Sequence, residues 1–280
     1  MALFIKNNIM AENAARQLGR SYDMLSKSIE RMSSGLRINS AKDDAAGLAV
    51  RELMRADIAV IRQGSRNASD GISMMQTMEG AMAAIDTLLI RMKELAEQAS
   101  TGSYSDQQRN IMNNEYGQMI DEIDRIATRT EFNSINMLNS ATGTQLIHFG
   151  INTAGSASSI TVRSVDVRVL ALGINENSAE HRIALASNAE NALSLVNEAI
   201  KIKDSARAAF GYSMNRLETT QSVLDIQAEN VSAAESRISD ADIAIEMASL
   251  TRNQVLAQAG VSMLAQANTL PQMALTLLRG

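Results

Sequence analysis

Apolar residues that recur alternately every three and four positions are the feature of this sequence that most constrains its fold. The spacing runs through positions 11–36, returns at 78–99 and 112–126, and recurs every seven residues from 217 to 245. Such a pattern places one apolar stripe along a helix that meets another helix over its whole length. A helix of about fifty residues would be roughly 75 Å long. We therefore expect a mainly α protein built as a long antiparallel helical rod or coiled-coil bundle.

The composition agrees with thin, closely packed helices. Of the residues, 45% are hydrophobic but only 3% are aromatic, and the chain has 17 Met, one Pro and no Trp. A core of Ala, Leu, Ile and Met lets helices approach closely, whereas a globular core of this size usually relies on aromatic bulk. With no Cys, disulfides, thiol catalysis and thiolate metal sites are excluded.

Charge and hydropathy narrow the classes of partner. The net charge of −5 argues against nucleic acid as a partner. No run of about 18 apolar residues suggests a membrane span, and no basic and apolar leader with a small-residue cleavage site is recognisable at the N-terminus. We expect neither a membrane anchor nor export by an ordinary signal peptide.

A polar hinge interrupts the helical pattern in "RMSSGLRINSAKDDAAG", residues 31–47. Gly35 and Gly47 allow the backbone to turn there. Asp43 and Asp44 come just before a new helical pattern, where acidic side chains suit the helix dipole. A catalytic role for this carboxylate pair is the less favoured interpretation.

A single strand-like region separates the helical segments. The stretches 144–151 and 159–170 show apolar alternation and flank a loop rich in Gly and Ser, which favours one short β-hairpin near 144–170. Upstream, Ser105 or Asp106 is expected to cap a third helix that ends near Arg129. Helix resumes after Asn188.

The C-terminal segment lacks charge from 253 to 278. Uncharged amides can be buried in an interface without the cost of burying an ion, so we expect a helix that is surrounded by protein on most sides or lines a polar channel. An amphipathic core helix of a single domain is the alternative. Its polar stripe is Gln254, Gln258, Ser262 and Gln266, opposite Leu256, Met263, Leu264 and Leu275.

The first and last helices have no partner nearby in sequence, so we expect them to pair with each other. The apolar residues expected to pack in the first helix include Leu18, Tyr22, Leu25, Ile29 and Met32.

Enzymatic chemistry finds no support in the sequence. His148 and His181 do not form the zinc-binding spacing H-E-x-x-H, and no glycine-rich loop suits a phosphate. We expect no enzyme activity and no cofactor.

Five stretches of the chain are distinctive: "ERMSSGLRINSAKDDAAGLAV", "SRNASDGISMMQTMEGAM", "LIRMKELAEQAS", "EIDRIATRTEFNSINML" and the C-terminal run "AAESRISDADIAIEMASLTRNQVLAQAGVSMLAQANTLPQMALTLLRG". These stretches resemble bacterial flagellin. The resemblance covers roughly the first 140 and the last 95 residues. Little lies between them, which resembles a short flagellin without the outer variable domains.

The resemblance implies a division of the chain into tube and rod. Residues 1–42 would be the N-terminal half of an inner-tube domain plus a connecting spoke, 43–235 a rod domain, and 236–280 a second spoke plus the C-terminal half of the inner tube. The apolar residues named above would pack the tube, and the stripe from Gln254 to Gln266 would line its channel.

The resemblance also implies a function. The chain would be a self-polymerising structural subunit of the flagellar filament, exported unfolded by the flagellar type III apparatus and located outside the cell. Its partners would be further copies of itself, the export apparatus and an export chaperone, and the filament cap and hook-junction proteins. The alternatives are a hook–filament junction protein or another exported helical-bundle protein.

By the same resemblance, Arg91, Glu94, Leu95 and Glu115 occupy the positions of a patch recognised by the host Toll-like flagellin receptor. Arg91 and Leu95 share a helix face because they are four residues apart. Leu95 could equally be a core residue, and Arg91 and Glu115 could simply form an ion pair between rods.

Overall fold

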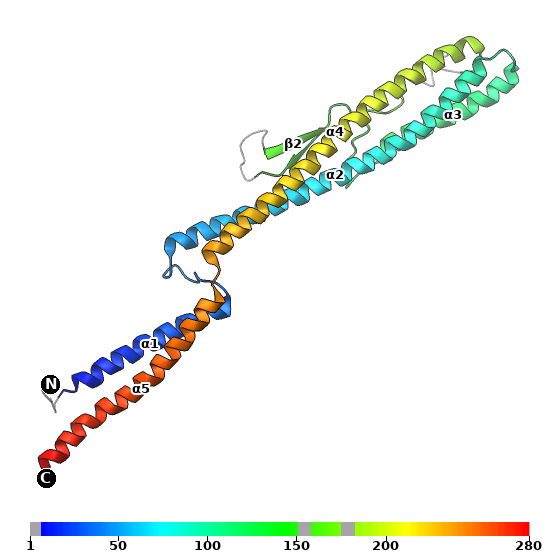
Figure 1. The fold of residues 1–280 in the computed structure, drawn as a ribbon. Helices are drawn as coiled ribbons and strands as arrows, with labels where there is room; N and C mark the ends of the chain where they lie inside the picture. The colour runs from blue at the N-terminus through cyan, green and yellow to red at the C-terminus, as the bar shows by residue number, and fades with distance from the viewer. Residues whose placement is uncertain (1–6, 151–157, 175–182, 280) are drawn as a thin grey trace. The chain divides into compact units, whose positions relative to one another are not determined.

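The computed structural model describes residues 7–150, 158–174 and 183–279, and for 271, 272 and 274–279 it describes the backbone alone. The chain forms five helices and one two-stranded sheet in these ranges (Figure 1), which confirms the mainly α prediction with a single hairpin. The elements in chain order are α1 (Ile9–Ser34), α2 (Ala45–Ser100), α3 (Asp106–Arg129), β1 (Thr144–His148), β2 (Ser159–Arg163), α4 (Ala186–Ser239) and α5 (Ile243–Arg279).

The chain divides into two compact units. The terminal unit comprises residues 1–56 and 230–280, and the central unit comprises residues 57–229. These divisions fall inside the long helices α2 and α4, whereas the sequence suggested divisions at 42/43 and 235/236. None of the described helices is long and apolar enough to span a bilayer.

Local capping fixes the ends of α1 and α3. Asn8 precedes α1, and its side chain accepts a hydrogen bond from the Ala11 amide at 3.1 Å. At the other end Gly35 has φ of +71°, the left-handed conformation that glycine adopts without strain. Ser105 forms a capping box with Gln108 at the start of α3. Ser105 is therefore the cap of the two candidates in the sequence.

A buried arginine closes the corner between α2 and α3. Arg109 donates from Nε to the carbonyl of Ala99 at 2.9 Å and from its terminal nitrogens to the carbonyl of Thr101 and the carboxylate of Asp106, each at 3.0 Å. The last carbonyls of a helix have no partner within the helix, so this guanidinium satisfies groups that would otherwise be left unpaired.

The core of the central unit lies between its helices and under the hairpin. Methionine and small aliphatic side chains dominate it, as the composition predicts. Buried members from α2 are Met74, Met75, Met78, Met82, Ile85, Leu89, Met92, Leu95, Ala96 and Ala99, and from α3 Met112, Tyr116, Ile120, Ile123 and Ala127. Such closely packed interiors respond to the loss or addition of a single methylene.

The hairpin is shorter than the sequence pattern suggests. β1 and β2 pair antiparallel, with Ile147 opposite Ile160, and Ile160 and Val162 point into the core. After Arg163 the chain leaves β1, because the amides of Val165 and Val167 donate instead to the carbonyls of Met137 and Leu138. The alternating pattern up to residue 170 therefore serves two different partners.

Polar contacts tie α2 to α4 inside the central unit. Lys203 of α4 is only 2% exposed, and its ammonium forms ion pairs with Asp86 of α2 and with Asp204. Further along, Arg207 pairs with Glu79 at 3.1 Å, and the Ser65 hydroxyl donates to Asp225 at 2.8 Å. These polar contacts join α2 and α4 at three places along the central unit.

Candidate functional site

Small and polar residues form the seam between α1 and α5 in the terminal unit, where the two helices run side by side (Figure 1). The buried and half-buried positions of α1 follow a three-and-four spacing that includes Ser21 and Ser28. The buried positions of α5 are Asn253, Ala257 and Ala267. These fully buried side chains are small or polar, and the larger seam residues Leu18, Leu25, Met32 and Leu264 are only half-buried, so the pair covers its apolar side chains incompletely within one chain.

Specific contacts fix the antiparallel alignment of this pair. Near the N-terminus of α1, Asn8 Nδ2 donates to the carbonyl of Ala267 at 2.8 Å. At its other end, Arg31 lies 3.8 Å from the carboxylate of Glu246. Between them, a methyl group added at Gly260 would lie 3.1 Å from Leu18 Cδ1. The glycine therefore allows the two backbones to approach closely.

The outer surfaces of the two helices carry large apolar side chains. About half or more of each is exposed, in contrast to the small residues of the seam. On α1 they are Ile9, Met10, Tyr22, Met24 and Ile29, and on α5 they are Ile243, Ile245, Met247, Val255, Leu256, Val261, Met263 and Met273. Large apolar side chains exposed in such number on one pair of helices make this pair a candidate protein interaction site.

The expected packing residues divide between seam and surface. Leu18, Leu25, Met32 and Leu264 are half-buried within the pair, whereas Tyr22, Ile29, Leu256 and Met263 are exposed in the single chain. The side chain of Leu275 lies outside the described residues. The polar stripe of Gln254, Gln258, Ser262 and Gln266 is exposed throughout.

A short antiparallel backbone pairing joins the hinge after α1 to the segment between α4 and α5. The Arg37 amide donates to the carbonyl of Ser239 at 2.6 Å, and the Ala241 amide donates to the carbonyl of Gly35 at 2.9 Å. The Arg37 guanidinium adds a bond to the carbonyl of Ile238 at 2.6 Å. The two chain segments predicted as spokes are therefore bonded directly to each other.

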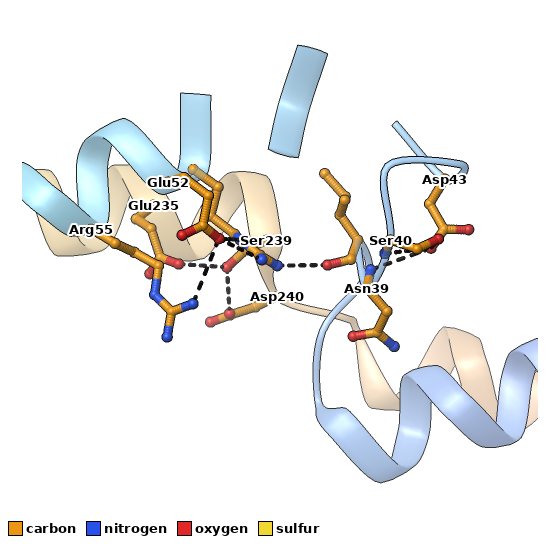
Figure 2. A network of polar contacts seen from close by, with 10 residues as sticks. Asn39, Ser40, Asp43, Glu52, Arg55, Glu235, Ser239 and Asp240 are labelled. Atoms are coloured by element: carbon orange, nitrogen blue, oxygen red, sulfur yellow. Dashed lines mark hydrogen bonds and ion pairs between the residues drawn. The ribbon is translucent and has the colours of Figure 1, made fainter. Parts of the chain in front are cut away.

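Asp43 organises the loop of the hinge (Figure 2). Its carboxylate accepts hydrogen bonds from the amides of Asn39 and Ser40 at 3.3 and 3.2 Å and from the Ser40 hydroxyl at 3.2 Å. Lys27 lies 2.7 Å away, and the hydrogen bond from its ammonium lowers the pKa of Asp43 far below the usual value. Asp43 therefore has a structural role in the loop. Its pKa is lowered, whereas a carboxylic acid that acts as a general acid needs a raised pKa.

Asp44 and Gly47 start α2. The Asp44 carboxylate accepts a hydrogen bond from the Gly47 amide at 2.9 Å, as an N-cap side chain does. A methyl group added at Gly47 would lie 2.5 Å from that carboxylate and 2.7 Å from Ile38 Cδ1. Glycine at 47 therefore leaves room for the Asp44 carboxylate and for Ile38, and glycine at 35 adopts its positive φ without strain.

A polar network beneath the hinge includes residues that the sequence analysis missed. Buried Arg51 donates to the carbonyl of Ile38 at 2.6 Å and pairs with Glu52 at 2.7 Å. Figure 2 shows Glu52 also facing Arg55, at 3.8 Å. The Arg51 hydrogen bond lowers the pKa of Glu52. Arg51 precedes buried Ile58 by one heptad, a signal that could have revealed its burial.

Fully buried Ser239 belongs to the same network (Figure 2). Its hydroxyl lies 3.0 Å from a carboxylate oxygen of Glu235 and 3.0 Å from one of Asp240. This short polar side chain lies at the end of α4, just before the segment that pairs with the hinge.

The candidate receptor patch in the central unit is a cluster of exposed charges over a buried leucine. Arg91 donates to Glu115 of α3 at 3.0 and 3.1 Å and to Glu94 at 3.1 Å. Hydrogen bonds to Glu94 and Glu115 raise the pKa of Arg91. Leu95 is 1% exposed and belongs to the core.

Metal chemistry finds no site in the described part of the chain. No group of three or more His, Asp and Glu side chains is arranged to hold a metal ion there. His148 is exposed on β1, and His181 lies outside the described residues.

Comparison with known proteins gives the family. The model of the bacterial flagellin N-terminal helical region matches residues 5–143, and that of the C-terminal helical region matches residues 193–278. Flagellin from Halalkalibacterium halodurans is 41% identical, covering 99% of this chain and 100% of the relative. The flagellar filament 31.3 kDa core protein of Treponema maltophilum is 40% identical over the same shares.

Two solved structures extend the comparison. The crystal structure of Bacillus cereus flagellin matches at 29% identity with a TM-score of 0.50, covering 61% of this chain and 94% of that one. A putative flagellar hook-associated protein from Vibrio parahaemolyticus shares the fold at 13% identity, with a TM-score of 0.58, over 71% of this chain and all of that one. With relatives aligned from end to end at about two-fifths identity, the chain belongs to the bacterial flagellin family.

Proposed function

We propose that this chain is the self-polymerising structural subunit of a bacterial flagellar filament. The observation that carries the proposal is the arrangement of the α1–α5 pair. Its own seam contains Ser21, Ser28 and Asn253, while large apolar side chains such as Val255 and Met263 face outward. Burial of those outer side chains requires neighbouring copies.

The physical basis is folding coupled to assembly. A two-helix pair with a small-residue seam gains little free energy alone, so its ordering is completed by the contacts that each copy makes with others. Head-to-tail contacts that do not close into a ring generate an open helical polymer. The uncharged stripe from Gln254 to Gln266 suits a surface that lines a channel, because its polar side chains form hydrogen bonds with water and carry no net charge.

Export in an unfolded state is compatible with this weakness of the terminal pair, although the central unit has its own core and must also be kept unfolded. A chain whose ends gain stability only from neighbours can be threaded through a narrow conduit before it folds. We propose that the flagellar type III apparatus and an export chaperone handle this chain, and that the filament cap and the hook-junction proteins are its partners outside the cell.

Seeded growth tests the proposed function. Purified full-length chain is added to short filament fragments, and growth is followed by electron microscopy. Deletion of residues 250–280 is expected to abolish growth, because it removes most of α5. Normal filaments from the truncated chain would refute the proposal.

A matched pair of point variants tests it without removing a helix. Val255 on α5 and Val223 on α4 are 59% and 57% exposed. Val255→Asp places a charge on the surface that we assign to assembly, so it is expected to slow growth far more than Val223→Asp. Equal growth by the two variants would contradict the assignment.

A hook–filament junction protein is the second candidate, because the Vibrio parahaemolyticus protein shares the fold. The two candidates differ in the length that they reach. A filament subunit extends seeds until free chain is exhausted, whereas a junction protein adds only a short zone. Growth that stops after a short zone would favour the second candidate.

For the receptor, we propose that the exposed charges Arg91, Glu94 and Glu115 form the recognition surface and that Leu95 supports them from the core. Arg91→Ala is expected to reduce signalling by monomeric chain in reporter cells that carry the Toll-like flagellin receptor. Arg125→Ala is the matched control, because Arg125 is also exposed and paired with Glu122 three residues away. An equal loss in both variants would contradict the proposal.

A further inference from the structure

The methionines of this chain are partitioned between its two units. Among those with described side chains, every exposed methionine lies in α1 or α5: Met10, Met24, Met247, Met263 and Met273. In the central unit, the described methionines are buried or half-buried, and Met78, Met82 and Met92 are almost completely covered. The chain has no cysteine, so these thioethers are its only sulfur.

This partition makes oxidation selective for the terminal helices. A hydroperoxide attacks a thioether only where its oxygen can reach the sulfur, and exposure therefore governs susceptibility. In the reaction, sulfur gives two electrons to the peroxide, its O–O bond breaks and an S–O bond forms. With hydrogen peroxide the leaving hydroxide takes up the proton of the hydroxyl group transferred to sulfur, so the products are methionine sulfoxide and water. Partial unfolding of the terminal helices would leave the same five sulfurs exposed.

Oxidation to the sulfoxide removes the apolar character that assembly requires of these side chains. The flexible apolar thioether becomes a polar, chiral group with a strong hydrogen-bond acceptor. Met24 and Met263 lie among the large exposed apolar residues that neighbouring copies would cover under the proposed function. Burial of a polar oxygen there without a donor costs free energy that the original methyl thioether does not.

We propose that the five exposed methionines of α1 and α5 are oxidation sites of the unassembled chain, and that their sulfoxides exclude a damaged copy from the growing filament. This inference rests on the proposed filament function. Once a copy is assembled, its neighbours cover the same thioethers, so the finished filament resists oxidation, as the central unit does through its own core. A thiol-dependent sulfoxide reductase returns the sulfur to the competent state.

The test treats full-length chain with hydrogen peroxide, maps the sulfoxides by peptide mass spectrometry and measures extension of untreated seeds. Sulfoxide is expected first in peptides of α1 and α5, with a fall of about tenfold or more in extension rate. Incubation with sulfoxide reductase is expected to restore extension. Intact filaments given the same treatment are expected to acquire less sulfoxide at these positions.

Two variants separate this effect from general damage. The first variant combines Met10→Leu, Met24→Leu, Met247→Leu, Met263→Leu and Met273→Leu. Leucine preserves volume and apolar character, so extension by this variant is expected to survive peroxide. The control variant combines Met119→Leu and Met214→Leu at half-buried positions of the central unit, and it is expected to remain sensitive.

Three results would overturn the inference: earlier oxidation of the central unit, undiminished extension by oxidised chain, or no recovery with reductase. The reductase measurement uses the natural sequence, so it remains decisive even where the five-leucine variant folds poorly. Failure of untreated chain to extend seeds would instead count against the proposed filament function.

Discussion

Removing Asp86 from the buried Lys203–Asp86 ion pair should lower the stability of the central unit much more than removing Lys203. Lys203 is 2% exposed, whereas the side chains of Asp86 and Asp204 are 28% and 61% exposed. Asp86→Ala leaves a buried ammonium with Asp204 as its remaining carboxylate, and the expected loss of unfolding free energy is about 3 kcal/mol. In a unit of this size, that corresponds to a fall of roughly 6–12 °C in Tm.

Lys203→Met should be much less disruptive. Methionine retains most of the apolar stem of lysine, and the two carboxylates left behind can be hydrated because they are partly exposed. The expected change is below about 1 kcal/mol in either direction. The double variant should recover most of the stability lost in Asp86→Ala, since the unpaired charge is gone.

Tyrosine fluorescence during urea unfolding can follow the central unit by itself. The chain has no Trp and four Tyr, and Tyr22 is the one that lies in the terminal unit. Measurements in a Tyr22→Phe background, at concentrations too low for assembly, therefore report the central unit. A larger loss in Lys203→Met than in Asp86→Ala, or additive losses in the double variant, would refute the reasoning.

Further predictions concern close packing, pH and capping. Gly64→Ala should lower the free energy of unfolding by about 1–3 kcal/mol, because the new methyl group would lie 2.6 Å from the Phe149 carbonyl oxygen. Gly80→Ala meets nothing within 4 Å and should stabilise α2 by up to about 1 kcal/mol. Urea unfolding of the two variants tests the difference. The lowered pKa of Asp43 means that its ion pair contributes stability above the unfolded pKa, near 4, and loses it as the pH falls further. Asp43→Asn should therefore lower the Tm of the seeded polymer, in which the terminal helices are ordered, as followed by circular dichroism at pH 7, and the difference from wild type should narrow below about pH 4. Ser105→Ala removes the capping box and should cost about 1 kcal/mol in urea unfolding, and an unchanged midpoint would contradict that role.

The sequence predicted the helices well because their apolar spacing is long and regular. The third helix was expected from the stripe that includes Met112, Tyr116 and Ile123, and α3 buries all three. The hairpin was also expected, but its length was overestimated. Alternation reveals that Val167 is buried, whereas it cannot reveal that its amide bonds to Leu138 instead of β1.

The faces of the terminal helices were harder to assign from sequence. Tyr22 and Ile29 fit the apolar spacing, yet Ser21 and Ser28 occupy the neighbouring buried row in the single chain. Periodicity ranks residues by hydropathy, whereas two backbones that approach closely favour small side chains. A stripe therefore cannot distinguish the face toward a helix of the same chain from a face toward other copies. The burial of Arg51 was not predicted, because a search for apolar residues at heptad positions leaves out charged ones.

The small side chains between α1 and α5 also bear on how growth begins. Leu18 packs against Gly260, and the fully buried residues of the seam are small or polar, so an isolated copy has little to gain from ordering its ends. A copy that docks beside several others gains much more. Spontaneous polymerisation should therefore show a long lag and a sharp critical concentration, and fragments of existing polymer should remove the lag.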